Sequence, residues 1–369
     1  MQWTLAVGLL ALMPSAVTAQ PRPIELTKPE ARLDESFSQL AAVRELRDGR
    51  VLLVDTKEKL LQIGDFARKT VQTIGHQGSG PGEYNTPIGL VAMPGDLTWV
   101  YDPLNQRFLV VSPDGKPGEL VPLSSLGSLK GLSMMLLPSA DARGRLYFEA
   151  VNQTTMSGKD STVILRWTRG QAALDTAGYV APMDFGIETV GGKMRIRAMR
   201  MFAPQETWVV DPAGRLARVT PAPYRVIWYD AARKATIGPA VRYQPVPVTE
   251  DEKDEVRKQI KQALAGVGAA AAVRQGFKVP EPEFAPTKPP FAGKGTALIG
   301  PAGEVWVARS GLLKEPTRYD RFDPQGRLVG QVSLNPRSTV LGFGRGTLYV
   351  ARKDEDDLMY LERYRWPAR

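Results

Sequence analysis

The 369 residues of this chain, 43% of them hydrophobic, are enough to enclose a large core. The absence of cysteine excludes disulfides and lipid attachment through an N-terminal cysteine, and the single histidine, His76, leaves a zinc site of several imidazoles with only one anchor. The chain has 48 Lys and Arg against 39 Asp and Glu, a formal net charge of +9, which favours anionic partners.

The beginning of the chain has the pattern of an export signal. Leu5 to Met13 form an apolar run too short to span a bilayer, and the small residues Ala16 to Ala19 follow it. We predict a signal peptide, residues 1–19, that is cut after Ala19. An uncleaved anchor is the alternative, because no Lys or Arg precedes the apolar run. The mature chain is expected in the periplasm or outside the cell, without a transmembrane segment and not as a lipoprotein.

An internal repeat dominates the rest of the chain. Six times a small turn pair leads into a short apolar strand, and an alternating stretch rich in aromatic residues follows after a polar gap. Such units predict an all-β fold, a six-bladed β-propeller with four-stranded antiparallel blades over residues 20–369. The turns contain Gly49, Gly95, Gly144, Gly214, Gly303 and Gly346.

Two intervals between these glycines are long and must hold insertions, at about 181–203 and 245–292. In a propeller they would leave from one face of the disc, where binding residues usually lie. Thr249 and Glu252 form a capping box at the start of the one clear helix, near 249–265, with Asp254 and Lys258 paired on its outer side. This helix is predicted either to close over the channel mouth or to cover an apolar patch.

The last repeat contains only three strand-like stretches. The alternating segment Ile24 to Thr27 is therefore predicted to supply the outer strand of the final blade and to close the ring. A frayed N-terminal tail is the alternative. We expect a monomer.

The loop from Gly75 to Tyr84 carries four glycines and ends in Gly-Pro-Gly-Glu-Tyr. It lacks the Gly-Lys-Ser/Thr end and the following helix of a phosphate-binding loop, so a turn is the better interpretation. Asp102, Asn105 and Arg107 lie in the next blade and are assigned to turn and inter-blade hydrogen bonds.

These two stretches resemble secreted bacterial six-bladed β-propellers of the NHL-repeat / TolB-like type, whose inter-blade loop commonly reads G-x-G-x-G-P-G-E-F/Y and whose strands end in V-x-D-x-x-N-x-R. The resemblance covers blades one and two, and over residues 170–290 it rests on strand rhythm alone. It implies a disc with a central channel and a ligand or partner on a loop face. It does not imply one chemistry.

Enzymatic relatives of this fold need residues that can be checked. The lyases that the resemblance includes use more than one histidine, whereas this chain has only His76. Lactonase-type propellers use acidic and asparagine metal ligands, and none is recognisable here. The acidic run Asp354 to Asp357 is interpreted as a solvated hairpin loop. We therefore predict no catalytic residue and no cofactor, and a divalent metal such as calcium stays open as an alternative.

Positive charge is the remaining signal for function. Arg195 and Arg197 lie in the most basic stretch, and Arg309 and Arg352 end the second strands of blades five and six, so these four are the candidate ligand-binding residues. The main prediction is an exported, non-enzymatic binding propeller that recognises a protein, an anionic saccharide or another envelope component on one loop face, and no nucleic acid. The alternative is a metal-dependent lactonase-like hydrolase or lyase with its site at the central channel.

Overall fold

The computed structural model describes residues 22–127, 134–151, 161–182, 187–190, 193–196, 200–265, 280–312 and 314–366. The predicted signal peptide lies outside these ranges. Within them, no helix has both the length and the apolar character needed to cross a membrane.

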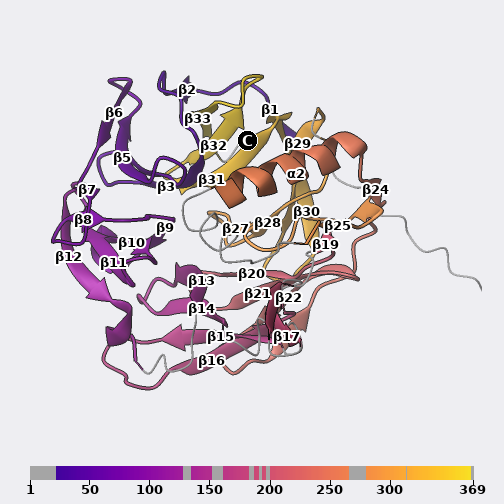
Figure 1. Cartoon of the computed structure of the whole chain (residues 1–369), viewed down its shortest axis with the longest axis horizontal. Helices are drawn as coiled ribbons and strands as arrows, with labels where there is room; N and C mark the ends of the chain where they lie inside the picture. Colours follow the sequence, from indigo (N-terminus) through magenta and orange to yellow (C-terminus); the bar gives the residue numbers. More distant parts are fainter. Residues whose placement is uncertain are drawn as a thin grey trace, which may run out of the picture.

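Six antiparallel sheets surround a central axis (Figure 1), which confirms the predicted all-β, six-bladed propeller. In each blade the first strand is innermost, and the chain then runs outward. The strands of blades one to three are β3 (Leu40–Glu45), β4 (Val51–Asp55), β5 (Leu60–Asp65) and β6 (Thr70–Thr73); β9 (Gly89–Ala92), β10 (Thr98–Asp102), β11 (Arg107–Val111) and β12 (Pro117–Pro122); and β13 (Met134–Ala140), β14 (Leu146–Val151), β15 (Thr162–Trp167) and β16 (Asp175–Val180).

Blades four to six repeat this order. Their strands are β20 (Thr207–Val210), β21 (Leu216–Pro221), β22 (Tyr224–Tyr229) and β23 (Ala235–Ile237); β27 (Ala297–Ile299), β28 (Val305–Ala308), β29 (Pro316–Phe322) and β30 (Leu328–Pro336); and β31 (Ser338–Gly344), β32 (Thr347–Lys353) and β33 (Met359–Arg365). The aromatic-rich stretches of the repeat are the third strands of the blades.

The N-terminal segment closes the ring differently from the prediction. β1 (Ile24–Leu26) does not join the final blade but pairs in parallel with β30, at the outer edge of blade five. The final blade receives its fourth strand from β2 (Ala31–Arg32), which is antiparallel to β33. The prediction named the wrong blade. β30 is a long strand whose outer edge pairs with β1 in blade five, and the chain then continues to the final blade, where β2 pairs with β33.

The second strands of blades one to three are buried along their whole length. Every residue of β4, β10 and β14 is buried, because neighbouring blades pack against both faces of these strands. Aromatic side chains fill the space between blades. Between blades two and three, for example, the Trp99 ring centroid lies 5.3 Å from that of Phe108 and 6.1 Å from that of Trp167. This apolar packing between blades holds the disc together.

One face of the disc carries a repeated aspartate–arginine turn, and we call it the turn face. Asp141 accepts hydrogen bonds from the backbone of the turn and pairs with Arg145 Nε at 2.6 Å. Asp211–Arg215 and Asp323–Arg327 repeat this pair at 2.8 and 2.7 Å. The arginines at these turns therefore have a structural role.

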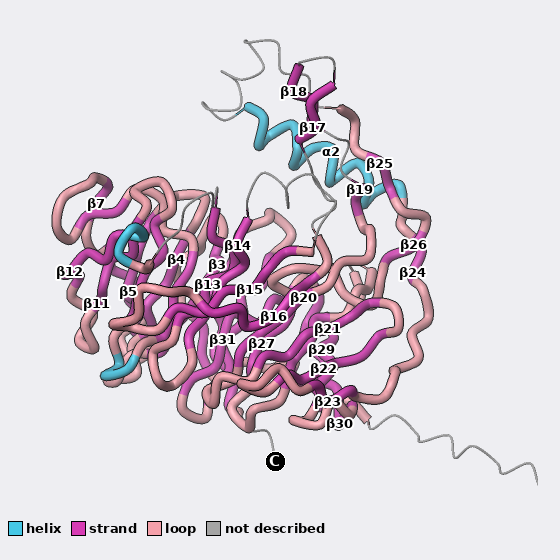
Figure 2. The backbone as a smooth tube through the Cα atoms, turned by 90° about the horizontal axis from the view of Figure 1, so that it is seen from below, coloured by secondary structure: helices cyan, strands magenta, loops and turns pink. Residues whose placement is uncertain are grey.

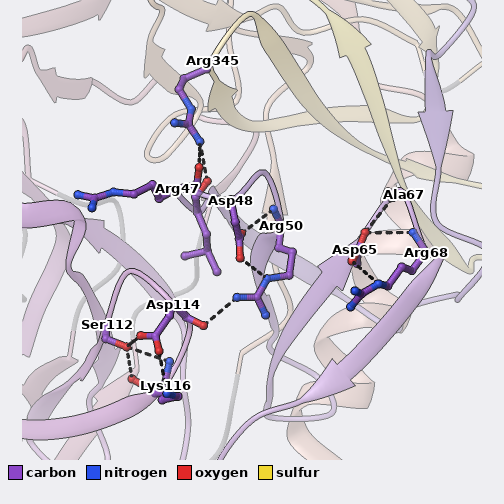
Figure 3. A network of polar contacts seen from close by, with 11 residues as sticks. Arg47, Asp48, Arg50, Asp65, Ala67, Arg68, Ser112, Asp114, Lys116 and Arg345 are labelled. Carbon is purple, nitrogen blue, oxygen red and sulfur yellow. Dashed lines mark hydrogen bonds and ion pairs between the residues drawn. The ribbon is translucent and has the colours of Figure 1, made fainter.

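Figure 3 shows how such turns also join neighbouring blades. Arg50 donates to Asp48 within its own turn, and its second nitrogen reaches the carbonyl oxygen of Asp114 in blade two at 2.8 Å. Asp114 in turn contacts Ser112 and Lys116. A single arginine thus links two blades on the turn face.

The opposite face carries the long connections between blades (Figure 2), and we call it the insertion face. The capping box is confirmed, with Glu252 Oε2 accepting from Thr249 N at 3.0 Å, but Asp254 pairs with Arg257 rather than with Lys258. The elements of these connections are β7 (His76–Gln77), β8 (Glu83–Tyr84), β17 (Ile187–Val190), β18 (Lys193–Ile196), β19 (Arg200–Met201), β24 (Val246–Pro247), α2 (Glu250–Ala265), β25 (Glu283–Phe284) and β26 (Thr287–Lys288).

Candidate functional site

The four candidate arginines do not form one cluster. Arg195 lies in β18, where its backbone is opposite Glu188, and Arg197 falls outside the described residues. Arg352 donates to Glu362 Oε1 at 2.7 Å, and this hydrogen bond to a buried carboxylate raises the pKa of Arg352. Arg309 follows β28 and lines a pocket on the insertion face.

The pocket has a volume of about 540 Å³, and we call it the Arg309 pocket. It lies between blade five and the connection that enters this blade. The residues that line it are Tyr243 to Pro247, Arg309 to Leu312, Glu315 to Arg318, Gln331 and Arg337. Three arginines and one glutamate are among them, so the pocket favours an anionic occupant.

A buried carboxylate forms an ion pair with Arg309. Asp320 is fully buried on β29, and its Oδ1 lies 3.6 Å from Arg309 Nη1. It also accepts hydrogen bonds from Tyr224 at 2.8 Å and from Gln331 at 2.6 Å. Burial raises the pKa of Asp320, and Arg309 opposes this rise. Asp320 therefore fixes Arg309 at the wall of the pocket and leaves part of its guanidinium fork for a ligand.

The other two arginines differ in how they are held. Arg337 contacts Asp357 and the carbonyl oxygen of Asp354. Arg318 is exposed on β29, and no carboxylate of the described part of the chain lies within ion-pair distance of it. Arg318 is thus the most available cation of the pocket.

The helix insertion is fastened to the same pocket. Lys288 of β26 forms a buried ion pair with Glu252, the capping residue of α2, and donates to the carbonyl oxygen of Gly311 at 2.7 Å. Tyr243 Oη lies 2.7 Å from the carbonyl oxygen of Lys288, and its ring lies 6.0 Å from the Arg309 guanidinium. The start of α2, β26 and the pocket loop therefore form one connected unit.

Residues considered for enzymatic chemistry lie elsewhere. His76 is exposed on β7, at the rim of the disc (Figure 2), with its Nε2 2.8 Å from Glu83 Oε1. Asp102, Asn105 and Arg107 hold the glycine loop by hydrogen bonds to its backbone, as the sequence predicted. In the described ranges there is no group of three or more His, Asp or Glu side chains that could hold a metal ion.

No family model matches the chain, and no curated protein matches its sequence. Solved structures with a similar fold include a gluconolactonase from Xanthomonas campestris, 10% identical, over 94% of this chain and 99% of that chain, with a TM-score of 0.46. A calcium-binding regucalcin from Agrobacterium tumefaciens is 11% identical over 92% and 95%, with a TM-score of 0.44. An inactive virginiamycin B lyase from Staphylococcus aureus is 13% identical over 89% and 82%, with a TM-score of 0.40.

At these identities the likeness concerns the propeller fold alone. The more specific NHL-repeat / TolB-like resemblance stays a prediction from the first two blades. The activities of these neighbours are not carried over to this chain.

Sequence reasoning identified Arg309 from its place after a second strand and missed the rest of the pocket. Arg318 had no usable signal, because strand alternation places it on the same face as the buried Asp320 and its exposure is due to its place near the start of the strand. Tyr243 and Arg337 had none, since Tyr243 lies in the long connection that enters blade five and Arg337 is the single residue between β30 and β31.

Proposed function

We propose that this protein is an exported binding propeller that takes a small anionic ligand into the Arg309 pocket. The observation that carries this proposal is the excess of arginine over carboxylate around one concave site of about 540 Å³. Pockets for small molecules usually measure about 300–1,000 Å³. Arg309 and Arg318 supply planar donor groups that suit a carboxylate or a phosphate.

The rest of the wall narrows the ligand class. Thr317, Gln331 and the backbone of 310–312 add uncharged polar groups beside the arginines. Such groups recognise hydroxyls, so a sugar acid fits better than an inorganic anion. An exported, basic protein also meets anionic saccharides in the envelope. We therefore propose an anionic saccharide as the ligand and a protein partner as the competing outcome.

The binding step needs no rearrangement of the pocket floor. Asp320, Tyr224 and Gln331 already hold one another by hydrogen bonds, so Arg309 is oriented before the ligand arrives. A ligand carboxylate replaces water at Arg309 and Arg318 and leaves the Asp320 contact intact. Preorganisation of this kind lowers the cost of binding.

The test measures the melting temperature and the calorimetric Kd of the protein with digalacturonate, and with lactose as an uncharged disaccharide. Digalacturonate is expected to raise the melting temperature, because it binds only the folded state. Added salt should weaken the binding of digalacturonate, because it screens the charges. Arg318→Gln should weaken binding about tenfold or more. Arg68→Gln, an exposed arginine of blade one, is the matched control. Equal affinity for lactose would overturn the proposal.

The metal-dependent hydrolase or lyase is the alternative proposal. It requires several carboxylate or amide side chains that converge on one point of the channel. Among the described residues no three His, Asp or Glu side chains form such a group, so amide ligands would have to complete the site. A melting temperature that falls with chelator and recovers with calcium, together with hydrolysis of gluconolactone, would favour it over the binding propeller.

A further inference from the structure

The central channel forms a second cavity, separate from the Arg309 pocket. It has a volume of about 470 Å³ and lies between the inner strands of five blades. Its walls come mainly from small and aliphatic residues. They include Ala42 of β3, Leu90 of β9, Val209 of β20, and Leu298 and Ile299 of β27.

The polar side chains of this wall are almost all engaged. Tyr101 donates its hydroxyl to the carbonyl oxygen of Met135 at 3.0 Å, and Trp208 donates its indole N–H to Glu149 at 2.8 Å. Ser139 is the remaining polar side chain, and no charged residue of the described chain lines this cavity. A sugar or an inorganic ion would lose its hydration here without new partners, whereas an alkyl chain would gain from burial.

A cationic mouth adjoins the channel at the turn face. Leu90 lines both the channel and a cavity of about 390 Å³ that contains three arginines. Two of them are paired, Arg47 with Asp96 at 2.8 Å and Arg345 with Glu45 at 3.2 Å. Figure 3 shows Arg345 reaching the turn that contains Arg47.

Arg44 is the third arginine, and it lacks such a partner. It donates to the carbonyl oxygen of Leu97 and to the hydroxyl of Thr98, both neutral acceptors. No carboxylate among the residues described here lies within ion-pair distance of it. Partial burial lowers the pKa of Arg44, and the nearby charge of Asp96 only partly opposes this. A half-buried cation with neutral partners is stabilised by an added anion.

We propose that the channel binds an aliphatic carboxylate, with its chain between the inner strands and its carboxylate at Arg44. The apolar wall alone would suit any alkane, and the arginine alone would suit any anion. Leu90 lines both cavities, so the two parts of one amphiphile would occupy adjoining spaces. This site shares no lining residue with the Arg309 pocket, so either can exist without the other.

The test is calorimetric titration of the full chain with octanoate, decanoate and dodecanoate below their micelle concentrations. We expect one molecule per chain and a Kd that falls about fourfold for each methylene added, because each is removed from water. A Kd that does not change along the series would overturn the channel assignment. Dodecanol should bind about tenfold more weakly than dodecanoate, and equal affinity would overturn the placement of the carboxylate.

Two substitutions test the two ends of the path. Leu298→Trp should abolish binding because the larger ring fills the channel, whereas Val329→Trp, at an exposed position of β30, should not change it. Arg44→Gln should weaken dodecanoate about tenfold and leave dodecanol unchanged. Circular dichroism and melting temperature verify folding, and unchanged Kd values in folded variants would overturn the proposal. Digalacturonate should not compete with dodecanoate, which separates this site from the Arg309 pocket.

Discussion

Blades one and two differ from blade five at the same point of the repeat, where the second strand ends. In the first two blades this position holds aspartate. Asp55 accepts from the backbone of Ser38 at 2.8 Å, and Asp102 from the backbone of Asn85 at 2.9 Å, so each fastens the chain that enters its blade. Blade five has Arg309 there, and its loop surrounds a pocket instead.

The difference shows how one position can serve the fold or a site. The chain that enters blade five is held by other contacts, through Tyr243 and Lys288, so the capping aspartate is not needed. Blade six also has an arginine at this point, Arg352, but its guanidinium donates a hydrogen bond to Glu362. Blade five combines the substitution with an open cavity. Four measurements test whether this position acts on the fold in one region and on a site in the other.

The largest expected effect is on the fold. Asp102→Ala leaves the backbone N–H groups of Asn85 and Thr86 and the buried cation Arg107 without their partner. We expect a loss of about 3 kcal/mol or more in the free energy of unfolding, measured in urea. A loss under about 1 kcal/mol would mean that the aspartate does not fasten the blade.

The matched change in blade five should act on binding rather than on stability. Arg309→Gln leaves Asp320 with its hydrogen bonds from Tyr224 and Gln331, and the raised pKa of Asp320 eases its protonation. We expect digalacturonate affinity to fall about tenfold or more, with a smaller loss in the free energy of unfolding than for Asp102→Ala, because Asp320 keeps two hydrogen-bond donors. A large stability loss with unchanged affinity would make Arg309 a structural residue like Asp102.

The next effect is local and concerns the insertion. Lys288→Met removes the partner of Glu252 and the donor to Gly311, so the start of α2 loses its tie to blade five. Hydrogen exchange measured by mass spectrometry should become faster over 250–260 while the inner strands stay protected. Lys253→Met, which breaks only an exposed pair with Glu250, is the control. If residues 250–260 exchange at the same rate in both variants, Lys288 does not hold the start of α2 to blade five.

At alkaline pH, blades two and five are expected to behave alike, so this measurement should show the smallest difference between them. Burial raises the pKa of Tyr101 in blade two and of Tyr319 in blade five to about 12, against 10.0 for an ordinary tyrosine. The folded state holds these protons more tightly, so the contribution of the two tyrosines to stability is constant below pH 10 and falls as pH rises towards 12. Urea unfolding at pH 9 and pH 11 measures this, and Tyr319→Phe should reduce the fall. Equal stability of the wild type at the two values would contradict the prediction.

The fold was predictable because its information is local. Each turn glycine and the strand after it lie within one short stretch, and repetition along the chain determines the blade count. The partner of Ile24 was not predictable, since its pairing with Val332 depends on two strand ends that are far apart in the sequence. Alternation predicts which face a strand buries but not which edge of which sheet it joins.

The site was predictable only in part, for the same reason. Arg309 is visible as a cation where a strand ends. Arg318 and Arg337 become neighbours of Arg309 only when blade five closes, and Tyr243 reaches them through a connection of irregular sequence. Arg44 has no sequence signal, because its lack of a carboxylate partner is a property of the folded interface between blades one and two.

Because β1 and β2 close the ring, their pairing also determines when during synthesis and folding the ring can form. Both strands are synthesised first, but their partners, β30 and β33, are among the last segments to be made. The ring therefore cannot be sealed until almost the whole chain is available, and the loop that must close is nearly as long as the protein. We expect sealing to be the final and slowest step of folding.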